Sequence, residues 1–409
     1  MAEVKEKMPG PLAGVRVLDF TTMVAGPAAT MMLADQGAEV IKIESPRGDL
    51  MRHLGQGRNG TSASFLCCNR NKRSLAVDLK AAEGLTIVKK LIATADVMVH
   101  NFRPGAVERA GLGEDAVRAI RRDIVYVSIS GFGESGPYAG QRAYDPVIQA
   151  LSGLAEIQRD RDTGRPRMVR TIIADNTTAL TAAQAITAAL FARQKSVQGQ
   201  HVRIAMLDAM ISYLWPEAMA SLTFVGDEID PAEGDLGPDM VFAAQDRYLT
   251  AATLSDDEWA GMCRALDRHD LVDDPRFKTA HDRSLHGVER REIVAAELEK
   301  WTASEILPRL LSNDVPSAPV LSRFELLQDR QVRENHILEE FESKTFGKVR
   351  MPRAAAQFDR TPAGVRALAP LLGADNAAIL GELGYSGDDI ARLAGGRVVH
   401  NQPGNSPGE

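Results

Sequence analysis

The sequence predicts an α/β protein in which a smaller α+β domain is inserted into a large domain built on an open parallel sheet. Three observations carry this prediction. Short apolar segments alternate with helical patterns over the first half of the chain, which is typical of parallel strands joined by helices. The composition changes after about Ser221. The length of 409 residues, 44% of them hydrophobic, suffices for two or three domains with sizeable cores.

The first predicted unit is a strand, a helix and a second strand. Residues 15–20 alternate in the manner of a strand, and Ala25-Gly26-Pro27 follows as punctuation. Pro27 suits the first turn of a helix, and Gly37 suits its end. Residues 39–43, Glu-Val-Ile-Lys-Ile, then return as a strand. These segments together predict a βαβ unit.

The same alternation continues along the chain. Further strands are expected at 97–99, 124–129 and 201–205, with helices at 83–95, 116–122 and 177–193. After a Gly-, Pro- and acid-rich loop at 226–238, helical patterns dominate, with the best examples at 257–266, 289–301 and 304–311. A second linker is expected at 313–319. We therefore expect a large domain at 1–220, a small domain at 225–320, a return to the large domain at 321–400, and a disordered tail at 401–409.

Composition excludes several classes of protein. A net charge of −7 argues against a nucleic-acid partner or an anionic membrane surface. The three cysteines, Cys67, Cys68 and Cys263, form neither a disulfide framework nor a metal-ligand spacing, and the histidines show no metal-binding motif. The longest apolar tract, 179–192, is interrupted by polar residues. We expect a cytoplasmic protein without a metal or a membrane span.

Two local patterns could bind an anionic ligand. Residues 131–136, Gly-Phe-Gly-Glu-Ser-Gly, match a dinucleotide fingerprint literally, but Pro137 follows where a helix should begin. A loop that lets another segment or a ligand approach closely is the favoured interpretation. The basic run 70–73, with Lys80, Arg103 and Arg109, is either a solvated surface or a site for phosphates at the ligand edge of the sheet.

Asp175 precedes a long Ala-rich helical pattern and allows two interpretations. An Asp at this position can cap the helix by accepting hydrogen bonds from its free amides. A carboxylate there is also kept ionised by the helix dipole, which suits a nucleophile. Position alone leaves both open.

A set of ordered motifs adds a family resemblance. They are Gly14-Val15-Arg16-Val17-Leu18-Asp19 with Ala25-Gly26-Pro27, Leu33-Ala34-Asp35 with residues 37–44, Gly48-Asp49, Asn71-Lys72-Arg73-Ser74, Asp78-Leu79-Lys80, Ala95-Asp96-Val97, residues 101–105, residues 131–138, Ala369-Pro370, Leu372-Gly373 and Leu383-Gly384-Tyr385. Over residues 10–395 the chain resembles the family III CoA-transferases, which include formyl-CoA transferase and are related to α-methylacyl-CoA racemase.

The resemblance implies a Rossmann-like large domain, an interlocked homodimer and transfer of coenzyme A from an acyl-CoA to a free carboxylic acid. No tightly bound cofactor is implied, since the acyl-CoA is the substrate. Asp175 falls at the position of the family's nucleophilic aspartate, which forms an aspartyl-CoA thioester. The family's CoA contacts fall at ten positions: Val24, Ala25, Val77, Lys80, Asn101, Phe102, Arg103, Arg109, Arg142 and Tyr144.

The chain also departs from the family pattern. Ser45 stands where formyl-CoA transferase has a basic CoA contact, and Val24 replaces a glutamine of its active site. The Gly-rich loop of the oxalate-using members has no counterpart at 226–250, so oxalate is not the expected acceptor. Tyr144 stands where the racemases have a catalytic histidine, and a phenol is a poor base at neutral pH. A racemase, or a CoA-binding protein without catalysis, remains the alternative.

Overall fold

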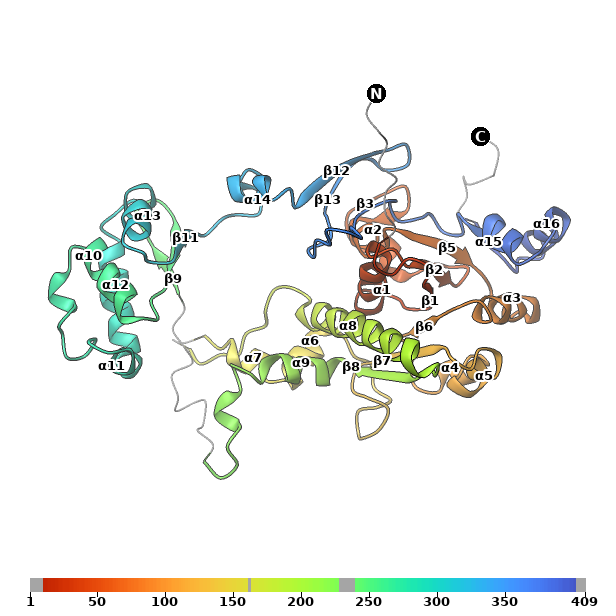
Figure 1. Ribbon diagram of the computed structural model, residues 1–409, viewed down its shortest axis with the longest axis horizontal. Helices are drawn as coiled ribbons and strands as arrows, with labels where there is room; N and C mark the ends of the chain where they lie inside the picture. Colours follow the sequence, from red (N-terminus) through yellow and green to blue (C-terminus); the bar gives the residue numbers. More distant parts are fainter. Residues whose placement is uncertain (1–9, 161–162, 228–239, 402–409) are drawn as a thin grey trace. The chain divides into compact units, whose positions relative to one another are not determined.

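The structure is a computed structural model that describes residues 10–160, 163–227 and 240–401. It divides into two compact units, Met1–Glu217 with Ile337–Glu409, and Ala218–His336, which are described here separately (Figure 1). The composition of the sequence predicts an inserted domain at 225–320, and the second unit covers that range and extends beyond it at both ends. The expected tail at 401–409 lies outside the described residues except for Asn401, as does most of the acid-rich loop.

The first unit is built on a six-stranded sheet, which confirms the predicted α/β class (Figure 1). All pairings in this sheet are parallel. In spatial order the strands are β5 (Lys72–Ala76), β2 (Glu39–Glu44), β1 (Arg16–Asp19), β6 (Val97–His100), β7 (Val125–Ser130) and β8 (His201–Ala205). The chain builds outward from β1 to β5 and then returns to the other side of β1 with β6.

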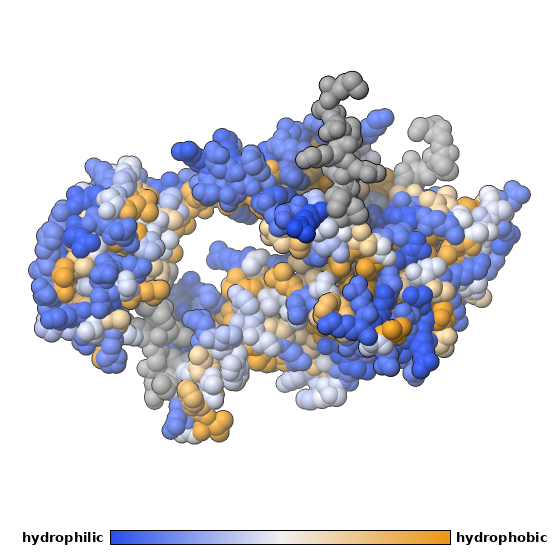
Figure 2. All heavy atoms as spheres, viewed as in Figure 1, coloured by the Kyte–Doolittle hydropathy of each residue, from blue (hydrophilic) through white to orange (hydrophobic). Residues whose placement is uncertain are grey.

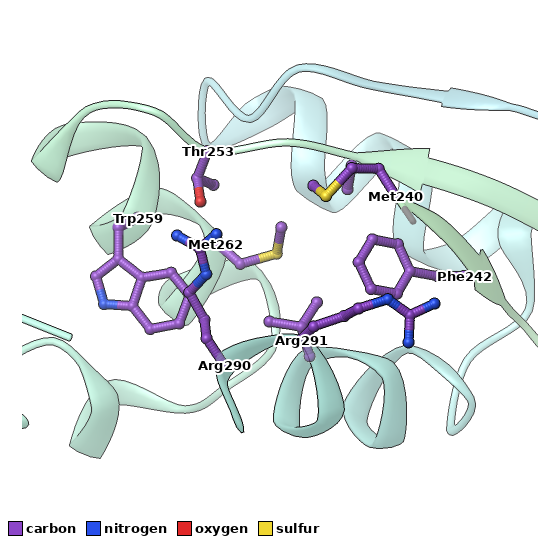
Figure 3. Close-up of a pocket in the computed structure, with 9 residues that line it drawn as sticks. Met240, Phe242, Thr253, Trp259, Met262, Arg290 and Arg291 are labelled. Carbon is purple, nitrogen blue, oxygen red and sulfur yellow. The ribbon is translucent and has the colours of Figure 1, made fainter. Parts of the chain in front are cut away.

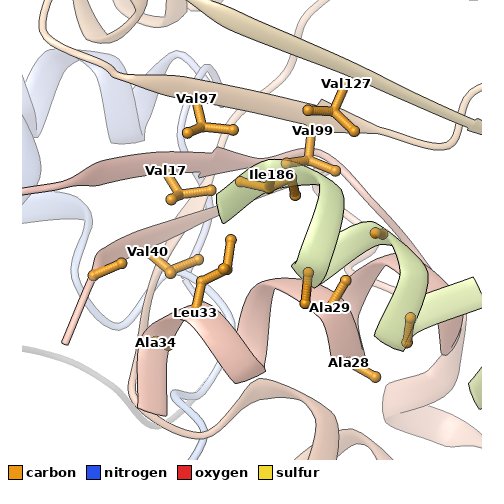
Figure 4. Packing of buried hydrophobic residues seen from close by; sticks show 14 of the residues in the cluster. Val17, Ala28, Ala29, Leu33, Ala34, Val40, Val97, Val99, Val127 and Ile186 are labelled. Carbon is orange, nitrogen blue, oxygen red and sulfur yellow. The ribbon is translucent and has the colours of Figure 1, made fainter. Parts of the chain in front are cut away.

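Alternate residues of each strand enter separate cores on the two faces of the sheet. Val17, Val97 and Val99 face α1 and α8, whose small residues allow the two helices to pack closely (Figure 4). Leu18 and Met98 belong to the core on the other face. This period of two is the pattern that a sheet covered on both sides requires.

The helices of this unit connect and cover the strands. Their bounds are α1 (Ala25–Asp35), α2 (Ala63–Asn69), α3 (Ala82–Ile92), α4 (Ala106–Arg109), α5 (Glu114–Ile120), α6 (Asp145–Leu151), α7 (Leu154–Ile157), α8 (Ile173–Ser196) and α9 (Met206–Leu214). A short hairpin, β3 (Gly57–Arg58) with β4 (Thr61–Ser62), precedes α2. The first turns of α1 and α8 lie together, since the Ala25 amide donates to the Asp175 carboxylate.

The C-terminal segment returns to this unit and contacts both cores. The hairpin of β12 (Leu338–Ser343) and β13 (Gly347–Pro352) packs on the α1 side, and α15 (Asn376–Glu382) and α16 (Gly387–Gly395) pack on the other. Val399 forms a β-bridge with Val77, directly after the edge strand β5. The last described residues therefore complete a sheet that begins near the N-terminus.

The second unit has its own core and an α+β composition. Its antiparallel sheet consists of β11 (Ser317–Pro319), β10 (Tyr248–Ala251) and β9 (Val241–Ala243), and its helices are α10 (Asp256–Ala265), α11 (Ala280–Leu285), α12 (Gly287–Leu298), α13 (Ala303–Ser312) and α14 (Arg330–Glu334). Trp259 and Phe277 belong to its buried cluster, and their ring centroids lie 5.6 Å apart.

The molecular surface mixes hydrophilic and hydrophobic side chains (Figure 2). Leu180 and Phe191 of α8 are exposed apolar residues, at 61% and 59% of their area. Over the described residues, no helix combines the length and apolar character that a membrane crossing needs.

Candidate active site

The carboxyl ends of parallel strands meet at one edge of a sheet, and the predicted site residues follow those ends. Val24 and Ala25 come after β1, Val77 and Lys80 after β5, and residues 101–103 after β6, while Arg142 and Tyr144 end the loop after β7. The direction of chain progression reverses between β1 and β6. Open α/β sheets bind ligands in the crevice at such a reversal.

The loops after β1 and β6 are joined at this reversal. The Asn101 side chain donates to the Thr22 carbonyl oxygen at 2.9 Å and accepts from the Thr22 amide at 3.0 Å. Phe102 is half-buried, and its ring packs near His100 and Phe20. The predicted contact Asn101 therefore also fixes the loop that leads to Val24 and Ala25.

Asp175 faces this same loop. It is the third residue of α8, and its Oδ1 accepts a hydrogen bond from the Ala25 amide at 3.1 Å. Ala25 is the first residue of α1, and the preceding residue, Val24, provides no side-chain cap. The carboxylate thus lies at the N-terminal ends of two helices, and both dipoles favour its ionised form.

The capping role that the sequence left open for Asp175 belongs to Asp145. Helix α8 begins after Ile172 without a cap bond of its own, and Asp145 Oδ2 accepts from the amides of Ala174 and Asp175 at 2.7 and 3.3 Å. Asp145 is 3% exposed, and its Oδ1 accepts from Gln149 at 2.5 Å. Sequence reasoning missed Asp145 because its partners lie some 30 residues further along the chain.

Burial decides the ionisation of Asp175. Desolvation raises its pKa from 3.8 to about 6, the Ala25 amide opposes this rise, and the nearby Asp145 carboxylate adds to it. At pH 7 a carboxyl with that pKa is about nine-tenths ionised. It is also a stronger base than an ordinary aspartate, which suits a nucleophile.

Four predicted cations at this edge are free to meet a ligand. Lys80, Arg103, Arg109 and Arg142 are exposed, and none of them forms an ion pair with another described residue. Arg47, which sequence reasoning missed, shares these properties in the loop after β2. The sequence pattern that could have identified Arg47 is its position two residues after Ser45, where the basic contact of the family is absent.

The basic run 70–73 is structural and not a phosphate site. Arg70 and Lys72 are buried in ion pairs with Asp35 and Asp19, at 2.6 and 2.8 Å. Arg73 pairs with Glu39 and Glu382. The solvated-surface interpretation is equally wrong, because Lys72 has an exposed side-chain fraction of 0%.

The apolar residues of the predicted CoA-contact set differ in which of their atoms a ligand could contact. Val24 and Ala25 are buried at the start of α1, where Ala25 presents its amide to Asp175. Val77 is 0% exposed, its amide donates to the Glu44 carbonyl, and it belongs to the core that includes α3. Any contact of Val77 with a ligand is therefore restricted to its backbone.

The glycines at 131–136 permit a close approach of two segments and do not open a helix. A Cβ on Gly131 would lie 2.2 Å from the Cβ of Ala143, so only glycine allows the loop to return beside its own beginning. No helix follows until α6 at Asp145, which removes the dinucleotide interpretation. Tyr144, next to Ala143, is 59% exposed.

A second polar cluster lies beside this loop. His201 bridges Ser128 Oγ at 2.8 Å and Glu114 Oε2 at 2.7 Å, in the order of a Ser-His-Glu triad. Ser128 lies within strand β7, and its Oγ is also 3.2 Å from Glu134 of the glycine loop. The cluster therefore ties β7, β8 and the loop together and exposes no nucleophile at the sheet edge.

The second unit contains a cavity of its own. Met240, Phe242, Trp259, Met262 and two arginines, Arg290 and Arg291, surround it (Figure 3). Its volume of about 20 Å³ has room for about one water molecule. It cannot hold an acyl-CoA. Among the described residues, no group of His, Cys, Asp and Glu side chains could hold a metal ion.

Comparisons with known proteins agree with this picture. The model of "CoA-transferase family III" matches residues 12–376. The succinate–glutarate CoA-transferase of Agrobacterium fabrum is 33% identical over 94% of this chain and 98% of its own length. The formyl-CoA:oxalate CoA-transferase of Escherichia coli is 34% identical over 94% and 99%. A CaiB/BaiF family protein of Brucella suis has a crystal structure with a TM-score of 0.79, 30% identity, and coverage of 92% of this chain and 100% of its own.

An open parallel sheet with a half-buried carboxylate and unpaired cations at its carboxyl edge is typical of an α/β enzyme that acts on an anionic substrate. The family match and the curated relatives then define the group more closely. The chain belongs to the family III CoA-transferases, and it is an acyl-CoA:carboxylate CoA-transferase.

Proposed function

We propose that this enzyme transfers coenzyme A through a thioester formed on Asp175. The observation that carries the proposal is the contact between the Asp175 carboxylate and the Ala25 amide, in a half-buried position at the carboxyl edge of the sheet. This arrangement supports a carboxylate that is ionised at neutral pH yet poorly hydrated, and such a group is an effective nucleophile.

The proposed reaction is a series of acyl exchanges that needs only the acyl-CoA, the acceptor acid and the Asp175 carboxylate. A carboxylate oxygen of Asp175 attacks the donor thioester carbonyl, CoA leaves as the thiolate, and a mixed anhydride forms. The thiolate attacks the aspartyl carbonyl, and the donor acid leaves as a carboxylate. The acceptor carboxylate then attacks the aspartyl thioester and expels the thiolate, which captures the acceptor acyl group and restores Asp175. Each step exchanges one acyl bond for another.

We assign the nucleotide and phosphate parts of CoA to Lys80, Arg103, Arg109 and Arg142, with Arg47 as the cation that compensates for Ser45. Their exposure and lack of ion-pair partners among the described residues support this assignment. Val24, Ala25, Val77, Asn101, Phe102 and Tyr144 complete the proposed contact set.

The relatives suggest short dicarboxylic acids as the acceptors to test. Their names give succinate and glutarate in Agrobacterium fabrum and oxalate in Escherichia coli. The expectation against oxalate concerns residues 226–250, of which 228–239 lie outside the described residues. We propose succinate and glutarate as the first acceptor acids to test.

We further propose that the enzyme is an interlocked homodimer, as the family resemblance implies. The exposed apolar residues Leu180 and Phe191 of α8 are consistent with a surface that a second chain covers. The inserted unit, which leaves and rejoins the first unit by separate connections, supports the same arrangement.

The test of the covalent step is a reaction without acceptor. Wild-type enzyme mixed with succinyl-CoA should accumulate CoA on the peptide that contains Asp175, and hydroxylamine should then modify that residue, as peptide mass spectrometry can detect. Asp175→Asn should form no adduct. Asp208→Asn is the matched control, since Asp208 is an exposed carboxylate in the first turn of α9.

Two results would refute the proposed mechanism. One is an unmodified Asp175 peptide together with a fully active Asp175→Asn enzyme. The other is rapid uptake of deuterium at the α carbon of a 2-methylacyl-CoA in heavy water without an added acid, which the racemase alternative requires.

A further inference from the structure

Residues 21–24 form the loop that presents the Ala25 amide to Asp175. Two side chains hold this loop: one from strand β2 and one from the segment that follows β2. Lys42 Nζ donates to the Thr21 carbonyl oxygen at 2.9 Å. Asp49 Oδ1 accepts from the Met23 amide at 3.2 Å. These contacts lie two to four residues before Ala25, so they control the direction in which its amide points.

The backbone of this loop is strained where Asp49 holds it. Met23 has a φ of +70°, a left-handed conformation that residues with a side chain rarely adopt. Such a conformation persists only where its surroundings enforce it, and strained residues of this kind gather at functional sites. Without the Asp49 contact, Met23 is free to relax and to turn the following amides away from Asp175.

The two side chains are also matched to each other. Lys42 Nζ lies 3.1 Å from Asp49 Oδ2, and both side chains have exposed fractions of 0%. Burial by itself lowers the pKa of Lys42, but the carboxylates of Asp19, Asp49 and Glu44 outweigh this effect and raise it. The ammonium group is therefore charged at neutral pH and keeps Asp49 in place.

We propose that Asp49, held by Lys42, is a positioning residue for the nucleophile: it keeps the strained Met23 turn in the conformation that directs the Ala25 amide at Asp175. This inference rests on the proposed role of Asp175 as the nucleophile. An amide that donates to the carboxylate stabilises its charged form, so the turn sets how much of Asp175 is ready to react at a given pH. Asp145, close to Asp175 through the amides of α8, acts in the opposite direction.

The first variant is Asp49→Ala, and the matched control is Asp35→Ala. Asp35 is also a buried aspartate paired with a cation, Arg70 at 2.6 Å, but it lies at the far end of α1. Both variants leave a buried cation without its partner, and so both destabilise the fold. Because Asp49→Ala could fail to fold, Lys42→Met/Asp49→Leu is the second variant, in which apolar side chains of similar length replace both charges.

The primary measurement does not require turnover. Carbodiimide reacts with protonated carboxyl groups, so the pH dependence of Asp175 labelling, followed on its peptide by mass spectrometry, reports its pKa. We expect a midpoint near pH 6 in the wild type, a rise of about one pH unit in the Asp49 variants, and no change in Asp35→Ala. At pH 5 the rate of Asp175 thioester formation should fall about tenfold in the Asp49 variants, and at pH 7 only about twofold, with the donor KM within about threefold.

An unchanged labelling midpoint in a folded Asp49 variant, or an equal shift in the Asp35 control, overturns the positioning role. A wild-type enzyme that forms no thioester, while the midpoint still moves in the Asp49 variants, removes the proposed mechanism and leaves only the control of the Asp175 carboxylate by Asp49. The two hypotheses therefore fail on different measurements.

Discussion

The carboxylate of Asp175 is half-buried and lies close to Asp145, and both features oppose its ionisation. Its pKa is raised on folding, so folding favours the protonated form. The associated stability is present below the unfolded pKa near 4 and is lost as the pH rises through about 6. At neutral pH the charged Asp175 carboxylate therefore lowers the stability of the fold, as groups at functional sites often do.

Replacement of Asp175 by asparagine should separate chemistry from stability. We expect Asp175→Asn to abolish transfer and yet to raise the free energy of unfolding at pH 8 by about 1–3 kcal/mol. This gain should shrink below pH 6 and vanish near pH 4. Urea unfolding of both proteins at several pH values measures the difference. A destabilised variant at pH 8 would show that Asp175 is held mainly as a charged structural group.

The acid side of the wild-type rate profile follows from the same pKa. Since the ionised form reacts, kcat/KM should fall about tenfold for each pH unit below 6. The Asp208→Asn enzyme is the matched control and should keep this profile. A profile that is flat between pH 5 and 7 contradicts the assignment of Asp175 as the group that titrates.

Single alanine variants of Lys80, Arg103, Arg109 and Arg142 should raise the donor KM more than they lower kcat, because they remove binding that is equal in the ground and transition states. Each exposed contact to a phosphate should change KM about three- to thirtyfold. Arg122→Ala is the control, since Arg122 is exposed just before β7, at the opposite edge of the sheet. Unchanged KM values in all four variants would place CoA elsewhere.

At the scale of elements, local sequence patterns predicted the strands made of apolar residues and the helices whose apolar residues recur at helical spacing. The expected strand at 124–129 is β7 (Val125–Ser130), and the expected helix at 177–193 lies within α8 (Ile173–Ser196). Strand β5 was missed because Lys72, Arg73 and Ser74 are polar. Its charges are neutralised by carboxylates 30 or more residues distant in the sequence, at Asp19 and Glu39, which no local pattern contains.

The candidate site shows the same division. Lys80, Arg103 and Arg109 could be placed at the ligand edge from the pattern, because parallel strands present their carboxyl ends together, whereas the other contact positions came from the family resemblance. The contact between Asp175 and Ala25 spans 150 residues, so the local sequence left Asp175 as either a cap or a nucleophile, and the family resemblance favoured the nucleophile. The cap by Asp145 and the Met23 turn could not be predicted, since both depend on side chains that tertiary packing brings in.

The glycine loop after β7 provides a prediction at this scale. Gly131→Ala forces Ala143 away, because the new Cβ would lie 2.2 Å from it, and the shift carries Arg142 and Tyr144 along. We expect a destabilisation of about 1–3 kcal/mol and a raised donor KM. Gly140→Ala, in the same loop with nothing within 4 Å, is the matched control and should behave as wild type. Thermal unfolding and donor titration test both.

At the scale of the whole molecule, the proposed interlocked dimer predicts that dissociation and unfolding coincide. Chains that pass through each other cannot separate while both remain folded. Sedimentation at nanomolar concentration should show only the dimer until denaturant unfolds it, and the far-ultraviolet circular dichroism should change over the same range. A folded, active monomer at any concentration would contradict the interlocked arrangement.

The return of the C-terminal segment to the first sheet has a consequence for synthesis of the chain. Asn376 accepts from the Ala76 amide, and Val399 pairs beside Val77, so the edge at β5 is finished only by residues near the end. A ribosome that adds about 5–20 residues per second needs roughly 10–40 s to pass from β8 to these residues. During that interval the nascent sheet has an uncovered edge strand and an incomplete core on each face. A nascent chain interrupted in this period exposes the kind of strand edge that chaperones bind and that aggregation exploits.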